Sequence, residues 1–218
     1  MKIRRELPEE PAINEFLKIV GGYYSPIRDD YYENIFQKHP ILKGIASIGP
    51  NFYMIGDAKR LQYLHVSDTC QQIIGYTSQE IMEEEWKFQF QKVHHEDLQQ
   101  CLEMSQTAWS FLKELPPQEQ LKYVCNFYYR AVRKDLTTIK VQHQVGNLEI
   151  DADGRILLVF IIITDISHLD FSTEVKLAIV NTEENTCLLS NHRKTSLLEK
   201  EIILSRRESE ILNLFQQG

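Results

Sequence analysis

A histidine and three aromatic residues occupy the inward positions of two neighbouring predicted strands. Tyr123, Phe127 and Tyr129 fall on the apolar face of residues 121–133, and His143 shares the apolar face of residues 139–150 with two valines. An imidazole among apolar side chains can act as a polar handle in a ligand pocket. The alternative is a hydrogen-bonded core histidine within plain aromatic packing, and the pattern alone leaves both open.

Recognised catalytic and metal-binding motifs do not occur in the sequence. It contains no G-x-S-x-G, no H-E-x-x-H and no phosphate-binding glycine loop, and only nine glycines in all. The four cysteines form no C-x-x-C pair, which favours reduced, mostly buried thiols in a cytoplasmic protein; they are Cys70, Cys101, Cys125 and Cys187. We therefore expect no catalytic residue, no metal and no enzyme.

The composition argues against several classes of protein. The longest apolar run, "ILLVFIII" at 156–163, is the length of a strand and too short for the roughly 18 residues of a membrane span. The N-terminus lacks the apolar core of a secretory signal. A net charge of −7 argues against strong nucleic-acid binding by this stretch itself. These features predict a cytoplasmic protein with no membrane association.

The elements that would position these side chains follow from periodicity. Two strands are expected within 47–67 and short helices from Asp68 onward, with Asp68 as the first cap, Gly75 at the end of the first helix and a capping box of Thr77 and Glu80 on the second. A long helix is expected over about 95–115. Three antiparallel strands follow at 121–133, 139–150 and 155–167, and a further hairpin at 175–190. At the N-terminus, "INEFLKIV" and "DDYYENIFQK" predict two short helices within 13–38. This order indicates an α+β fold.

Residues 45–167 resemble the PAS domain family. The resemblance is carried by "HVSDTCQQIIGYTSQEI", by "VHHEDL", and by the run from "FYYRAVRKDL" to the strand-final "TDIS". His95, Leu136 and Ser167 depart from the proline, glycine and threonine usual in the family. The resemblance implies a five-stranded antiparallel sheet with helices on one face, and it makes Asp165 and Ser167 candidates for signal relay.

Members of this family hold flavin, haem, a small metabolite or no ligand. The reactive cysteine of the flavin-binding light sensors has no counterpart in "EEEWKFQFQK" (83–92), and His94 and His95 fit helix capping better than haem ligation. We therefore expect no flavin or haem, which leaves a small-molecule ligand of unknown identity or an empty pocket as the alternatives.

The last segment, "LSRRESEILNLFQQG" (204–218), predicts a capped helix, since Ser205 and Glu208 have capping-box spacing. It resembles the first helix of a LuxR-type helix-turn-helix domain, through Leu204, Ser205, Arg207, Glu208, Glu210, Ile211 and Leu212. Ser205, Arg207 and Glu208 would then mark the start of a DNA-binding domain truncated within this chain. The resemblance implies the sensory and dimerisation module of a bacterial transcription regulator. The alternative is a stand-alone small-molecule-binding or metabolic α+β domain with a docking C-terminal helix.

The expected organisation is an N-terminal helical extension (1–44), a PAS-like domain (45–170), a hairpin and connector (171–203) and a partial DNA-binding helix (204–218). A strand apolar at every position from 156 to 163 needs cover on both faces. Helices from 68–115 can shield one face. We therefore expect a homodimer in which the N-terminal helices and the outer sheet face contribute to the contact.

Overall fold

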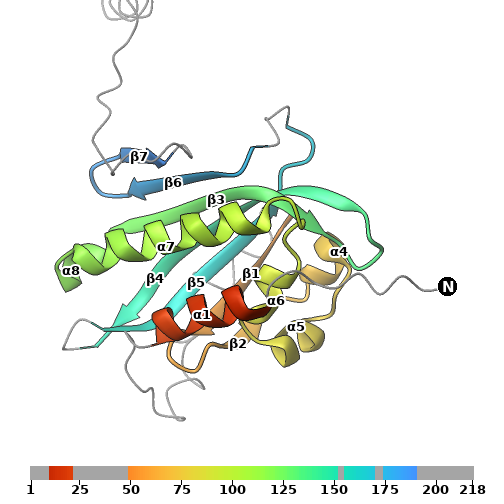
Figure 1. The fold of residues 1–218 in the computed structure, drawn as a ribbon, viewed down its shortest axis with the longest axis horizontal. Coiled ribbons are helices and arrows are strands. Elements are labelled where there is room, and N and C mark those ends of the chain that lie inside the picture. Colours follow the sequence, from red (N-terminus) through yellow and green to blue (C-terminus); the bar gives the residue numbers. More distant parts are fainter. Residues whose placement is uncertain (1–9, 22–48, 152–154, 170–173, 191–218) are drawn as a thin grey trace, which may run out of the picture.

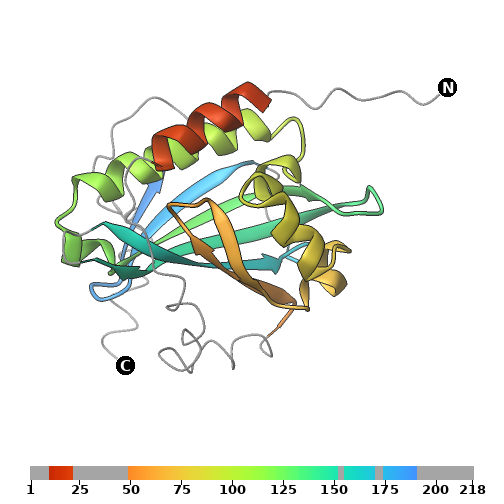
Figure 2. The same ribbon diagram turned by 90° about the horizontal axis from the view of Figure 1, so that it is seen from below.

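A single antiparallel sheet forms the framework of the protein. The structure is a computed structural model, and it describes residues 10–21, 49–151, 155–169 and 174–190. Figure 1 shows the sheet behind its helices, and Figure 2 shows helices α1 and α7 together on one side of it. This arrangement confirms the predicted α+β class.

The sheet has seven strands, in the order β2-β1-β5-β4-β3-β6-β7. Their bounds are β1 (Asn51–Asp57), β2 (Gln62–Val66), β3 (Tyr123–Val132), β4 (Thr138–Ile150), β5 (Ile156–Asp165), β6 (Lys176–Asn181) and β7 (Thr186–Ser190). The five strands predicted within 45–167 are present as β1 to β5, and the hairpin predicted at 175–190 forms β6 and β7. The C-terminal hairpin extends the same sheet, because Tyr123–Tyr128 of β3 pairs with Lys176–Asn181 of β6. This pairing buries Leu177 and Ile179 in the common core.

The inner face of the central strands carries the predicted alternation. Cys125, Phe127 and Tyr129 of β3 are buried, and so are Val141 and His143 of β4. Every residue from 156 to 163 in β5 is buried or half-buried, as expected for a strand covered on both faces. Regular two-residue periodicity thus sends one set of side chains toward the helices.

Five helices lie between β2 and β3 in the chain: α4 (Cys70–Ile74), α5 (Ser78–Glu84), α6 (Lys87–Gln91), α7 (Leu98–Glu114) and α8 (Pro117–Gln120). The predicted end of α4 is confirmed, because Gly75 adopts a left-handed φ of 80° as its C-cap. The predicted capping box of α5 is also present: Thr77 Oγ1 accepts the N–H of Glu80 at 3.2 Å, and the Glu80 carboxylate accepts the N–H of Thr77 at 3.0 Å.

Helix α1 (Glu10–Gly21) corresponds to the first predicted N-terminal helix. Ile13, Phe16 and Leu17 are buried, and the Phe16 ring meets the Phe90 ring edge-on at 5.3 Å. The helix therefore packs beside α7 on the helical face of the sheet (Figure 2) and does not cover the outer face. The apolar stripe of α1 completes the same core that α6 and α7 build. The second predicted N-terminal helix lies outside the described residues.

Candidate functional site

A cavity of about 70 Å³ lies between the inner face of the sheet and the helices that cover it. Strands β3, β4 and β5 form its floor, and α1, α6 and α7 with the residues flanking α6 form its roof. The floor residues are Cys125, Phe127, Tyr129, His143, Val145, Asn147, Val159 and Ile161. The roof residues are Phe16, Trp86, Gln89, Phe90, Val93, Cys101, Ser105, Ala108, Trp109 and Leu112. The cavity is thus built mainly of apolar and aromatic side chains.

Three of the four predicted pocket residues meet in this cavity. Phe127, Tyr129 and His143 line it, and the ring of Phe127 lies 5.8 Å from that of His143. Tyr123 does not line it: its ring packs edge-on against Phe111 at 5.1 Å. Tyr123 is the first residue of β3 and therefore faces the C-terminal part of α7, beyond the end of the cavity.

His143 and Tyr129 form a buried polar pair. The Tyr129 hydroxyl lies 3.1 Å from Nδ1 of His143, whereas Nε2 of His143 has no partner among the described residues. Burial lowers the pKa of His143 to about 4 and raises that of Tyr129 well above its ordinary value. Both groups are therefore neutral near pH 7.

Phe16 and Trp86 also line the cavity, and sequence reasoning missed both. Trp86 packs against Gly56 of β1, where a Cβ would lie 2.9 Å from the indole Nε1. The indole Nε1–H has no partner among the described residues. A glycine inside a predicted strand often marks a close approach by another group, so Gly56 was the available signal. Phe16 gave no such signal, because its amphipathic helix could have packed on either face of the sheet.

The two thiols of the cavity belong to Cys101 and Cys125, one from α7 and one from β3. Burial raises the pKa of Cys125 to about 12, and burial together with the charge of Asp97 raises that of Cys101. Neither thiol forms a thiolate near neutral pH, which agrees with the expectation of a buried, unreactive Cys125.

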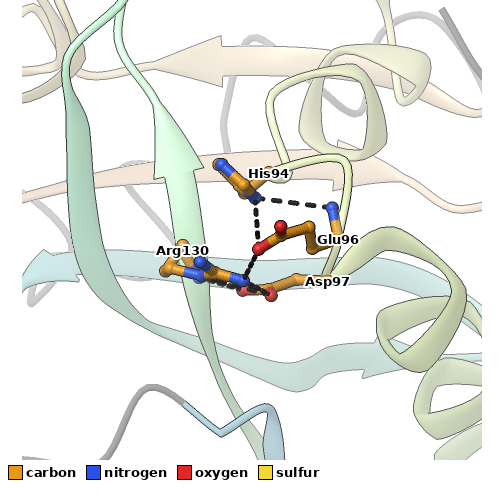
Figure 3. Close-up of polar contacts among 4 residues, drawn as sticks. All are labelled: His94, Glu96, Asp97 and Arg130. Carbon is orange, nitrogen blue, oxygen red and sulfur yellow. Dashed lines mark hydrogen bonds and ion pairs between the residues drawn. The ribbon is translucent and has the colours of Figure 1, made fainter.

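The segment before α7 is fixed to β3 by a charged network (Figure 3). Asp97, with 3% of its surface exposed, accepts the backbone N–H of Arg130 at 2.9 Å and binds its guanidinium at 2.5 Å and 3.1 Å. Glu96 binds the same guanidinium at 2.9 Å from a more exposed position. These carboxylates hold the pKa of Arg130 above its ordinary value.

The capping predicted for His94 and His95 is not observed, because Asp97 is the N-cap of α7 and receives no side-chain cap bond. Nδ1 of His94 accepts the N–H of Glu96 at 3.4 Å, which closes the turn before α7 (Figure 3). His94 and His95 stack on each other with ring centroids 4.4 Å apart. Neither lines the cavity.

The signal-relay candidates form a turn at the end of β5. Asp165 Oδ1 accepts the N–H of Ser167 at 2.9 Å, and Ser167 Oγ accepts the N–H of Lys140 at 3.0 Å. Asp165 pairs with Val141, two residues along β4 from His143. The turn therefore lies at the end of the β4–β5 pairing, in which β4 carries His143.

Other predicted site residues fall elsewhere. Ser205, Arg207 and Glu208 lie outside the described residues. Within residues 10–21, 49–151, 155–169 and 174–190, no three His, Cys, Asp or Glu side chains are grouped so that they could hold a metal ion. Each helix in that part of the chain is too short or too polar to cross a lipid bilayer.

The architecture is thus an antiparallel sheet with helices on one face and a small cavity between the two layers. The sequence model of the PAS domain family matches residues 50–168, which is more than half of the chain. This protein belongs to the PAS domain family. The predicted family is therefore confirmed, and with it the general function of a PAS sensory domain.

Solved structures of low sequence identity resemble the chain. One is the N-terminal domain of a diguanylate cyclase with PAS/PAC sensor from Marinobacter aquaeolei, with 14% identity over 54% of this chain and 96% of that one and a TM-score of 0.42. A sensory box histidine kinase/response regulator from Burkholderia thailandensis has 14% identity over 59% and 86%, with a TM-score of 0.44. The PAS domain of a Colwellia psychrerythraea protein has 10% identity over 61% and 97%, also with a TM-score of 0.44. No curated protein gives a significant match to this sequence.

Proposed function

We propose that this chain is the sensory and dimerisation module of a bacterial transcription regulator. Its PAS domain binds a small molecule in the cavity and carries out no catalysis itself. The observation that supports the sensing half is the mainly apolar cavity lined by the buried His143, whose ring nitrogen Nε2 has no partner among the described residues. Such a polar atom inside an apolar pocket is the usual means of orienting a ligand.

The output half of the proposal rests on the segment 204–218. Its match to the first helix of a LuxR-type domain, through Ser205, Arg207 and Glu208, supports a DNA-binding domain that begins there. Such domains read two half-sites as dimers, which supports a homodimer as the active form. The scattered, unpaired cysteines support a cytoplasmic location.

The proposed signal route follows the strand ladder. A ligand that contacts His143 acts on β4 and β5, whose joined ends carry the turn of Asp165 and Ser167. The chain then continues into β6, which pairs with β3 along the opposite edge of the cavity floor. The turn after β5 and strand β6 therefore both adjoin strands that line the cavity.

The experiment is a DNA-binding assay on the full natural gene product. Genomic fragments that it retains at physiological salt are sequenced, and binding to the enriched site is measured by fluorescence anisotropy as a function of salt concentration. We expect a specific site of two half-sites, and loss of binding when the chain is ended at residue 203. A gene product without specific DNA binding would eliminate the regulator and leave the stand-alone ligand-binding domain.

A further inference from the structure

We propose that the cavity selects a small, neutral molecule with a hydrogen-bond acceptor, such as a carbonyl or ether oxygen, which receives the Nε2–H of His143. This inference rests on the proposed ligand-sensing function and names the chemical class of ligand. It follows from the hydrogen-bond arrangement of one buried pair, from the charge of the cavity wall and from the size of the cavity.

The direction of the Tyr129–His143 hydrogen bond decides which group faces the ligand. If the hydroxyl donates to Nδ1, the imidazole carries its own hydrogen on Nε2, and one donor remains without a partner. If Nδ1–H donates to the hydroxyl oxygen, both the Tyr129 hydrogen and the Nε2 lone pair lack partners, since the hydroxyl has no second acceptor among the described residues. Each buried unsatisfied group destabilises the fold because it has lost its hydrogen bonds to water. The first arrangement is therefore favoured, and His143 presents an N–H donor.

The second unpartnered polar atom in the wall is also a donor. It is the indole Nε1–H of Trp86, which lies against Gly56 and Val159. Val159 is four residues along β5 from Ile163, the partner of His143. At roughly 3.3 Å per residue, Val159 beside Trp86 and Ile163 opposite His143 are about 13 Å apart along the strand. A small ligand thus meets one donor, and a longer one meets a donor at each end.

The wall excludes charged ligands. None of the side chains that line the cavity among the described residues is Asp, Glu, Lys or Arg. The buried imidazole is neutral at pH 7, so it offers no charge to an anion. A charged ligand would lose its hydration without an ion pair to replace it.

The size of the cavity limits the ligand further. A cavity of about 150 Å³ is known to accommodate benzene, and this one measures about 70 Å³. By proportion it accepts about three non-hydrogen atoms without expansion, and any larger ligand must widen it. A ligand this small gains at most about 1.5 kcal/mol per atom, so a single hydrogen bond makes up a large share of its affinity.

The first test is the tautomer of His143. Long-range ¹H–¹⁵N spectra of the 218-residue chain distinguish Nε2–H from Nδ1–H through the two nitrogen shifts, with His143→Phe used for assignment. We expect Nε2–H. The Nδ1–H form would overturn the inference, because Nε2 would then be an acceptor.

The second test is a set of probes of one shape and four non-hydrogen atoms: acetone, isobutene, acetate and isopropylammonium. Acetophenone and α-methylstyrene repeat the carbonyl and hydrocarbon pair with a ring attached. Binding is followed by chemical-shift changes of cavity residues. We expect each carbonyl to bind about fivefold to tenfold more tightly than its hydrocarbon partner, and no saturable binding of the two ions.

The variants separate this inference from the proposed function. His143→Phe should remove the preference for the carbonyl, Tyr129→Phe should weaken it by freeing the tautomer, and Tyr123→Phe, outside the cavity, should leave it unchanged. Equal binding of carbonyl and hydrocarbon, or a preference for an ion, overturns the acceptor inference and leaves ligand sensing in place. If no probe shifts any cavity resonance, ligand sensing fails and the inference fails with it.

Discussion

At the scale of single residues, the buried imidazole of His143 makes stability depend on pH. The ordinary histidine pKa of 6.5 falls to about 4 in the folded protein. Because the folded-state pKa is the lower one, the unfolded chain binds the proton first as the pH falls. Above pH 6.5 His143 is neutral in both states and contributes no pH dependence. Between pH 6.5 and 4 it lowers the free energy of unfolding, by about 3 kcal/mol at roughly 1.36 kcal/mol per pKa unit.

We therefore expect His143→Phe to lose less stability than the unchanged protein when the pH is lowered from 6.5 to 4. Urea unfolding of both proteins at several pH values gives the comparison. Carboxylates common to both proteins cancel in the difference between the two curves. Parallel curves across this window would show that His143 is not buried and neutral in the folded state.

The second prediction at this scale concerns the two carboxylates that share Arg130. Asp97 is buried and Glu96 exposes 61% of its side chain. Asp97→Ala removes the acceptor of the Arg130 backbone N–H and a close contact to its guanidinium, so it should reduce the free energy of unfolding by about 1.5–3 kcal/mol. Glu96→Ala is the matched control and should cost less than about 1 kcal/mol. Thermal or urea unfolding measures both, and similar losses for the two variants would contradict this account.

At the scale of elements, the turn between β3 and β4 stores strain at Leu136. This residue has a φ of 69° and 82% of its surface is exposed, so its side chain gains little from packing. A left-handed backbone costs an L-residue roughly 1–2 kcal/mol, whereas glycine loses about 0.5–1 kcal/mol through its flexibility in the unfolded chain. Leu136→Gly should therefore raise the free energy of unfolding by about 0.5–1 kcal/mol. Leu136→Ala keeps the Cβ and should give no such gain; equal gains from both variants in urea unfolding would refute the role of φ.

The elements also show what the sequence could and could not predict. Strands β3 to β5, the Gly75 end of α4 and the capping box of α5 were predicted because alternation and capping are local patterns. The predicted N-cap Asp68 was wrong, since α4 begins after Thr69, and α6 was not predicted as a separate helix. The pairing of β6 with β3, and the face chosen by α1, depend on contacts between distant segments. Local periodicity does not contain that information.

The residues of the candidate site likewise divide into those that local sequence patterns predict and those that depend on tertiary packing. Phe127, Tyr129 and His143 were found because strand alternation places them on one face. Tyr123 obeys the same alternation but lies past the end of the cavity, where α7 fills the space with Phe111. Trp86 and Phe16 reach the cavity from helices or turns whose docking is tertiary.

At the scale of the whole molecule, the outer sheet face is the predicted dimer surface. Phe160 and Ile162 of β5 place large, half-buried apolar side chains there, whereas Tyr53 and Ile55 of β1 are already buried within the chain. Covering such side chains stabilises an interface by roughly 25 cal/mol per Å² of apolar surface. We expect the chain to sediment at micromolar concentration as a dimer of its 25.6 kDa subunit.

Two sets of variants test whether the outer sheet face forms the dimer contact. Phe160→Asp combined with Ile162→Asp should give a folded monomer in analytical ultracentrifugation, with folding checked by circular dichroism. Leu136→Asp changes an exposed leucine in the β3–β4 turn and should remain dimeric. A monomeric unchanged chain, or a dimer that persists in the double variant, would exclude this surface.

The position of Phe16 has a consequence for how this domain can be moved between proteins. The family match covers residues 50–168, yet α1 supplies part of the cavity roof and β6 supplies part of the core. A chimera joined at the family limits would carry a sensor with an open roof and a bare sheet edge. Its ligand specificity would then depend on which segments of the new host protein packed against the cavity. Recombination that keeps residues 10–190 together transfers the sensor with its selectivity; recombination at the family limits transfers only a scaffold.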